Sequence, residues 1–124
     1  MIPATVARKR LLMMSVLLLP GLLVDCRSRP TASVSLAQLV ANQDAYVGRL
    51  VDTTGMVRSF IDATGRYYVI EDSHQNRVEL LPASRADPYE GGRIEVTGKF
   101  GFDERTGRFI VIEGILPLRP GGTG

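Results

Sequence analysis

The sequence predicts a mainly β domain: a small five-stranded Greek-key barrel with one short helix on its N-terminal side. Two segments of similar sequence, "TGRYYVIE" and "TGRFIVIE", indicate two similar hairpins. Strict alternation of apolar and polar residues after Gly92 has the period of a half-buried strand. Thirteen Gly and seven Pro residues, with few aromatics, favour short strands and turns over long helices.

The helix is expected at Leu36–Ala41 and the first strand at about Arg49–Ile61. Ser35 is a suitable N-cap, and apolar residues recur in the helix at positions i, i+3 and i+4, which makes one apolar face. Gly55 interrupts the long first strand. A glycine at such a place indicates a bulge or a sharp bend in the sheet.

Four further strands complete the predicted barrel. The second is expected at Tyr67–Asp72, the third at Arg77–Leu81 and the fifth at Phe109–Ile115. The fourth begins at Arg93, and its alternation predicts that every second residue faces the core. These core-facing residues are Ile94, Val96, Gly98, Phe100 and Phe102.

Two acidic turns join strands in this plan, at Asp62–Arg66 and Asp103–Arg108. In each, Asp favours the start of the turn, and Gly supplies the positive φ that a type I turn with a bulge requires. The acids do not have the spacing of an EF-hand loop. The turns are therefore interpreted as hairpin connections and not as a calcium site.

The N-terminal segment has the pattern of an export signal. Arg8-Lys9-Arg10 is a positively charged start, and Leu11–Val24 is an apolar run of fourteen residues that contains one Ser. A membrane-spanning helix needs about 20 apolar residues, so the run is short for a permanent anchor and fits a signal peptide. We therefore expect a signal or anchor helix within residues 1–25.

The single cysteine, Cys26, ends this segment in the stretch "LLVDC". The stretch resembles the lipobox of bacterial lipoproteins, in which a cysteine carries a diacylglyceryl group and becomes the new N-terminus. Leu23 and Val24 match that pattern, whereas Asp25 stands where a small residue is usual. The resemblance implies lipidation at Cys26 and a protein held at the membrane on its extracytoplasmic, periplasmic side. An uncleaved anchor and ordinary signal cleavage are the alternatives.

The length of 124 residues allows one domain with a leader and a tail. Between Val34 and Leu116 there are nine basic and twelve acidic residues, a net charge of −3, although the whole chain carries +2. A nucleic-acid binder usually carries a basic domain, so this balance disfavours one. The expected divisions are a signal peptide at 1–25, Cys26 with a linker at 26–33, the domain at 34–116 and a flexible tail at 117–124.

One helix and five strands in this order are the plan of an OB-fold. The segments "YVGRLVDTTGMV", "YYVIED", "GGRIEVTGKF" and "FIVIEGI" resemble bacterial OB-fold domains related to the anticodon-binding domain of aminoacyl-tRNA synthetases. The resemblance covers about residues 45–115 and implies a fold rather than a ligand. The connection from Pro82 to Gly92 leaves room for at most one helical turn, so we expect the helix at Leu36–Ala41 to plug the barrel.

OB-folds bind ligands on the face of strands two and three and on the two adjoining hairpin loops. Such a face needs exposed aromatic rings for stacking, and cations where the ligand carries phosphate. The candidate ligand-binding residues of this chain are Arg66, Tyr67, Tyr68, Arg77, Arg105 and Arg108. Because Tyr67 and Tyr68 are adjacent in a strand, one points outward if the other points inward.

No catalytic, metal or cofactor site is predicted. Asp72-Ser73-His74 contains the residue types of a hydrolase triad, but neighbours in sequence rarely have triad geometry, and His74 is interpreted as a solvated turn residue. A metal site at His74 would need two or more further ligands, and the chain has no second His or Cys to provide them. The chain also resembles the periplasmic haem chaperone of cytochrome c maturation in fold and topology. That family attaches haem through a histidine near the C-terminal end, which "LPLRPGGTG" lacks.

The sequence thus predicts a non-catalytic binding or interaction module, held at the membrane outside the cytoplasm. Its expected partner is an envelope protein, a peptide or a glycan. The alternative is an OB-fold that binds nucleic acid, which would show binding that falls steeply with salt.

Overall fold

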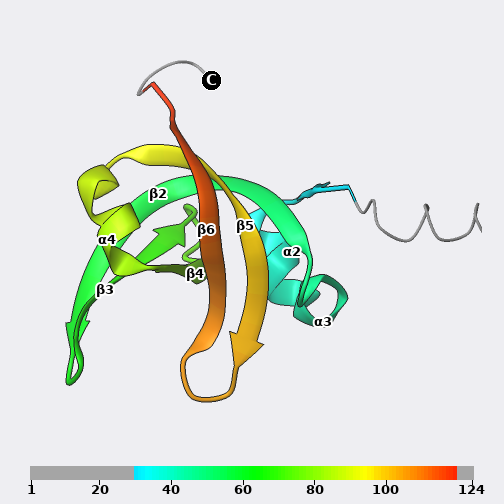
Figure 1. The fold of residues 1–124 in the computed structure, drawn as a ribbon, viewed down its shortest axis with the longest axis horizontal. Coiled ribbons are helices and arrows are strands. Elements are labelled where there is room, and N and C mark those ends of the chain that lie inside the picture. The colour runs from blue at the N-terminus through cyan, green and yellow to red at the C-terminus, as the bar shows by residue number, and fades with distance from the viewer. Residues whose placement is uncertain (1–29, 120–124) are drawn as a thin grey trace, which may run out of the picture. The chain divides into compact units, whose positions relative to one another are not determined.

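The computed structural model describes residues 30–119, and Figure 1 shows their fold. Strands account for most of the described chain, and the helical segments are short. In chain order the elements are β1 (Ala32–Ser33), α2 (Leu36–Ala41), α3 (Gln43–Tyr46), β2 (Leu50–Asp62), β3 (Gly65–Glu71), β4 (Arg77–Leu81), α4 (Ala83–Ala86), the 3-10 helix η1 (Asp87–Tyr89), β5 (Arg93–Asp103) and β6 (Gly107–Pro117).

The five long strands close into a barrel. Hydrogen-bonded neighbours follow the order β2-β3-β4-β6-β5, and β5 returns to pair with β2. All these pairs are antiparallel except β4 with β6, which is parallel. This order is that of an OB-fold-like Greek-key barrel, so the predicted mainly β barrel is confirmed in this form.

Strand β2 closes the barrel because it serves two partners. Its first half, Leu50–Met56, pairs with β5, and its second half, Met56–Asp62, pairs with β3. Figure 1 shows β2 as one long curved ribbon. Gly55 lies at the change of partner, where a Cβ atom would come within 2.8 Å of Cγ1 of Ile70. The predicted bend at Gly55 is therefore a place where β2 and β3 approach too closely for a side chain.

The core lies inside the barrel and beneath α2. Ser35 caps α2, since the backbone N–H of Gln38 donates to its hydroxyl at 3.1 Å, and Leu36 and Leu39 are buried against the barrel. The predicted helix thus begins and ends as expected and packs on the core. Other fully buried side chains are Val51, Val57, Ile70, Val78, Leu80, Ile94, Val96, Phe100 and Ile110.

The two hairpin turns have the predicted design. Asp62 Oδ1 accepts hydrogen bonds from the backbone N–H of Thr64 at 2.8 Å and from its hydroxyl at 2.7 Å. Asp103 Oδ1 accepts in the same way from the backbone N–H of Arg105 at 2.7 Å. Gly65 and Gly107 follow with φ of +125° and +89°, a conformation that glycine adopts without steric cost.

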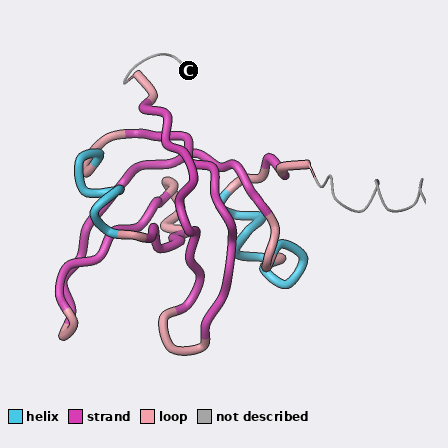
Figure 2. The backbone as a smooth tube through the Cα atoms, in the orientation of Figure 1, coloured by secondary structure: helices cyan, strands magenta, loops and turns pink. Residues whose placement is uncertain are grey.

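Several predicted boundaries were wrong. The sheet has six strands rather than five, because Ala32 and Ser33, assigned to the linker, pair in parallel with β2. An additional helical turn, α3, follows α2, and two turns, α4 and η1, connect β4 to β5. Figure 2 shows these two helical regions apart, on either side of the strands. Strand β6 reaches Pro117, and the N–H of Leu118 still donates to the carbonyl of Arg93, so the tail begins later than expected.

Phe102 does not face the core as the alternation predicted. Its side chain is 42% exposed, whereas Phe100 is buried. The β5–β6 hairpin continues past the end of the barrel, so its last core-phase position has no layer to pack against. The predicted signal helix, Cys26 and the end of the tail lie outside the described residues. Among residues 30–119 no helix is both long and apolar enough to span a bilayer.

Candidate functional site

The strands β2, β3 and β4 present one side to the core and the other outward. Core residues such as Val57, Ile70 and Val78 alternate with side chains on the outward side. The cross-strand register places these outward side chains in rows. We call this surface the outer face; its residues are Met56, Arg58, Phe60, Tyr67, Val69, Glu71, Arg77 and Glu79.

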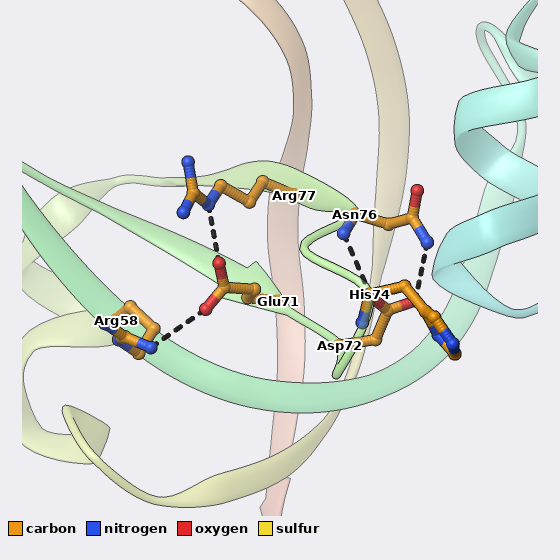
Figure 3. A network of polar contacts seen from close by, with 6 residues as sticks. All are labelled: Arg58, Glu71, Asp72, His74, Asn76 and Arg77. Carbon is orange, nitrogen blue, oxygen red and sulfur yellow. Dashed lines mark hydrogen bonds and ion pairs between the residues drawn. The ribbon is translucent and has the colours of Figure 1, made fainter.

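A buried carboxylate lies at the centre of the outer face. Glu71 is 6% exposed and is paired in register with Met56 on one side and Arg77 on the other. Its Oε1 lies 3.0 Å from Nη1 of Arg58, and its Oε2 lies 2.6 Å from Nε of Arg77 (Figure 3). Removal of a charge from water is costly unless it is paired, so the two arginines explain how Glu71 is accommodated.

Two aromatic rings and a guanidinium form a stack beside this carboxylate. Phe60 and Tyr67 are direct cross-strand partners, with ring centroids 5.8 Å apart. The Cζ atom of Arg77 lies 4.8 Å from the centroid of Phe60, within range of a cation–π interaction. Val69 is only 4% exposed although it belongs to the outer face, so its neighbours cover it. We call Phe60, Tyr67 and Arg77 the aromatic platform.

The charges around the platform do not make it positive. Both arginines of the outer face, Arg58 and Arg77, share one carboxylate, Glu71. Glu79 adds a second acid in the next row, and burial, followed by the charge of Asp62, raises the pKa of Glu79 above its ordinary value. The outer face thus combines stacking surface with balanced charge, which suits a neutral ligand better than a polyanion.

The predicted ligand-binding residues do not all meet. Tyr67 and Arg77 belong to the platform, but Tyr68 is 5% exposed, points into the core, and donates its hydroxyl to Asp87 Oδ1 at 2.7 Å. The prediction of Tyr68 as a surface residue was therefore wrong. Side chains alternate along β3, and because Tyr67 points outward, Tyr68 points into the core.

The other three predicted arginines point elsewhere. Arg66 donates to Ser59 Oγ at 3.0 Å and shares the phase of Tyr68. Arg105 is exposed on the β5–β6 turn. Arg108 donates from Nε to Gln43 Oε1 in α3 at 2.8 Å. These cations do not gather with Arg77 on one surface.

Three outer-face residues were missed: Arg58, Phe60 and Glu71. The alternation in "MVRSF" already places Arg58 and Phe60 on one side of the first strand. Glu71, by contrast, had no local signal, because its burial depends on two arginines from different strands.

The β3–β4 turn is built around Asp72, whose contact with His74 is to the backbone N–H, while Nδ1 of His74 lies 3.5 Å from Oγ of Ser73, so the three side chains are not arranged as a triad. Asp72 accepts from the backbone N–H of His74 at 2.9 Å, and from the backbone and side chain of Asn76 at 2.9 and 2.8 Å (Figure 3). Burial alone would raise the pKa of Asp72, but these hydrogen bonds outweigh it and hold the pKa below its ordinary value. His74 is exposed, as expected of a solvated turn residue. Within residues 30–119 no three His, Cys, Asp or Glu side chains are placed to hold a metal ion.

No protein-family model matches this chain, and no curated protein matches it. Among solved structures it is similar to a DUF3299 family protein from Pseudomonas aeruginosa PAO1, with 12% identity, 76% of this chain and 100% of that chain covered, and a TM-score of 0.46. It is also similar to the second OB-fold domain of replication protein A from Methanococcus maripaludis, with 11% identity, 61% and 88% covered, and a TM-score of 0.36. Because both scores lie below 0.5, the fold assignment rests on the strand order of this chain.

Proposed function

We propose that this chain is a non-catalytic binding module, tethered through Cys26 on the extracytoplasmic side of a bacterial membrane. Its ligand is an envelope protein, peptide or glycan, which it holds on the outer face of β2, β3 and β4. The observation that carries this proposal is the aromatic platform of Phe60, Tyr67 and Arg77. It occupies the face on which OB-folds commonly bind oligonucleotides and oligosaccharides.

The balance of charge on this face supports a ligand without phosphates. Binding to a nucleic acid draws its free energy largely from cations that replace counterions along the backbone. Arg58 and Arg77 are already paired with Glu71, and Arg108 is held by Gln43. A sugar ring or a peptide side chain needs only the stacking surface and a few hydrogen bonds, which the platform offers.

The platform can be tested with soluble glycan–peptide fragments of the bacterial cell wall. Chemical shifts of the ¹⁵N-labelled full-length chain are followed during titration. We expect saturable shifts at Phe60, Tyr67 and Arg77, and loss of binding in the double variant Phe60→Ala with Tyr67→Ala. The matched control is Phe102→Ala, which removes an exposed ring of the β5–β6 hairpin and should leave binding unchanged.

A parallel titration with single-stranded oligonucleotide decides the rival function. If the oligonucleotide binds and its affinity falls steeply with salt while the cell-wall fragments do not bind, the proposed ligand class is wrong. The tether is tested separately, by the mass of the mature N-terminal peptide from native cells and from Cys26→Ala cells. A lipid-modified Cys26 at the new N-terminus, lost in the variant, is the expected result; an unprocessed chain would contradict it.

A further inference from the structure

A second site lies beside the bend of β2 and adjoins the aromatic platform at Glu71, which pairs with Arg77. A cleft of about 480 Å³ opens there, a size that suits a small ligand. Its residues come from β2, from the first position of β5 and from the end of β3 with its turn. They are Thr54, Gly55, Met56, Arg58, Glu71, Asp72, Ser73, Gln75 and Arg93. The register places Arg93, Met56 and Glu71 in one row across β5, β2 and β3.

The acidic groups of this cleft already have hydrogen-bond donors. Both oxygens of Glu71 are paired, one with Arg58 and one with Arg77. Both oxygens of Asp72 accept hydrogen bonds, from His74 and Asn76, within the β3–β4 turn. Glu71 and Asp72 therefore do not require a cationic group of a ligand as a hydrogen-bond donor.

The guanidinium groups of the cleft, by contrast, have N–H donors that make no hydrogen bond within residues 30–119. The exposed side chain of Arg93 makes no hydrogen bond or ion pair with any side chain among residues 30–119. Arg58 uses Nη1 for Glu71, and its side chain is 50% exposed. The amide of Gln75 adds an uncharged donor at the rim, where the hydroxyl of Ser73 lies 3.5 Å from Nδ1 of His74. An excess of donors over open acceptors favours an anionic group.

A second cleft adjoins the first and is mostly apolar. It measures about 410 Å³ and shares Met56 and Arg93 with the first cleft. Its apolar lining residues are Pro88, Tyr89, Ile94, Pro117 and Leu118. Glu90 also lines it, and its carboxylate accepts a hydrogen bond from the hydroxyl of Ser59. An anion held by Arg93 would thus have apolar protein surface directly beside it.

We propose that the two adjoining clefts bind a carboxylate attached to an apolar group. Two molecules have this chemistry: a peptide that ends in an apolar residue with a free carboxyl group, and a short fatty acid. Arg93 binds the carboxylate, and the apolar part lies along Met56 toward Leu118. This site shares Met56, Arg58 and Glu71 with the outer face but contains no residue of the aromatic platform, and the proposal stands whether or not the platform binds a ligand.

Three probes test the site on the ¹⁵N-labelled full-length chain: acetyl-Gly-Gly-Leu, the same peptide with a C-terminal amide, and octanoate. We expect saturable shifts at Met56, Ser73, Gln75 and Arg93 with at least one of the two carboxylates, and none with the amide. Binding of the peptide alone assigns the site to chain ends, and binding of octanoate alone assigns it to free acids. Equal binding of the peptide and its amide, or no saturable shift with any probe, would overturn the proposal.

Two variants assign the anion to this cleft. Arg93→Gln removes the unpaired guanidinium and should weaken carboxylate binding about tenfold or more, the usual effect of one charge-assisted hydrogen bond. Ser73→Asp adds a negative charge to an exposed turn and should abolish binding without disturbing the barrel. The matched control is Arg105→Gln, an exposed cation on a distant turn, which should bind normally. Unchanged affinity in both cleft variants would contradict the assignment.

Discussion

Tyr68 donates its hydroxyl hydrogen to Asp87 across 2.7 Å, which joins β3 to the short connection between β4 and β5. The same connection is held from the other side, where Nη1 of Arg85 donates to the carbonyl of Ile112 at 3.3 Å. Ala86 lies between them and is completely buried. These contacts let two helical turns cover a barrel end that a longer helix often covers in this fold.

Replacement of Tyr68 by Phe should lower the free energy of unfolding at neutral pH. It should also reduce the loss of stability that the wild type shows as pH rises into the alkaline range. The hydrogen bond to Asp87, followed by burial, raises the pKa of Tyr68 above its ordinary value. A raised pKa contributes stability that is present below about pH 10, the unfolded value, and is lost as pH rises through the folded value. Urea unfolding at pH 7 to 11 measures this: the wild type should lose stability at the alkaline end, and Tyr68→Phe should lose less.

Tyr67→Phe is the matched control for this experiment. Tyr67 lies on the outer face next to Tyr68 and makes no hydroxyl hydrogen bond with another residue between 30 and 119. Its urea midpoint should therefore stay close to the wild-type value at every pH. If both variants behave alike, the Tyr68–Asp87 contact does not contribute to stability.

Asp72→Asn should destabilise the protein at neutral pH and have little effect in acid. The pKa of Asp72 is held below its ordinary value by hydrogen bonds from the β3–β4 turn. Stability from a lowered pKa is present above the unfolded value, about pH 4, and is lost as pH falls through the folded value. Urea midpoints measured from pH 2 to 7 should converge for the two proteins at the acidic end. A constant difference over the whole range would show that the charge of Asp72 is not the cause.

Gly55→Ala should cost about 1–3 kcal/mol of unfolding free energy, the usual effect of an added methyl group in a packed core. Its Cβ would come within 2.8 Å of Ile70 Cγ1 and of the carbonyl oxygen of Glu71, and neither neighbour is the end of a flexible side chain. Gly114→Ala is the control, because its Cβ would meet no atom within 4 Å. Denaturant unfolding compares the two, and equal stability would contradict the close approach of β2 and β3.

Removing the two arginines that pair with Glu71 should lower the free energy of unfolding more than removing the charge of Glu71 itself. Removal of both Arg58 and Arg77 leaves a buried carboxylate without a partner, which should cost roughly 3 kcal/mol or more. Glu71→Gln leaves two arginines that are about half exposed and can be hydrated, so its cost should be smaller, about 1 kcal/mol. Unfolding free energies of the double variant and of Glu71→Gln decide the point; the reverse order would contradict the burial of Glu71.

Local patterns predicted most of the barrel. The cap at Ser35 and the alternation after Arg77 gave α2 and β4 with the bounds that the structure has, because both signals lie within a few residues. Strand β1 has only two residues, and it exists because β2 offers a parallel partner for Ala32 and Ser33. A pairing that depends on a partner so far away in the chain cannot be predicted from the two residues themselves.

The candidate site was less predictable because its contacts join distant segments. Alternation showed that one of Tyr67 and Tyr68 points outward, but the choice depends on Asp87, nineteen residues further along the chain. The sequence offered Arg108 as a ligand-binding residue, but its Nε donates to Gln43, which is 65 residues away in the chain and therefore not a local signal. The platform itself depends on a stack between β2 and β4, which are not hydrogen-bonded to each other.

Under the proposed tether, the pairing of Ala32 and Ser33 with β2 would also limit how far the barrel can move from a membrane. Under the proposed tether, the five residues between Cys26 and β1 span at most about 17 Å, at roughly 3.3–3.6 Å per residue. A partner fixed in the same membrane would then be met at an effective concentration of about millimolar, as with other short linkers. At that concentration a ligand with a dissociation constant of about a millimolar is bound half of the time. Under the proposed tether, a small platform of two rings and one guanidinium would therefore be sufficient to hold its ligand.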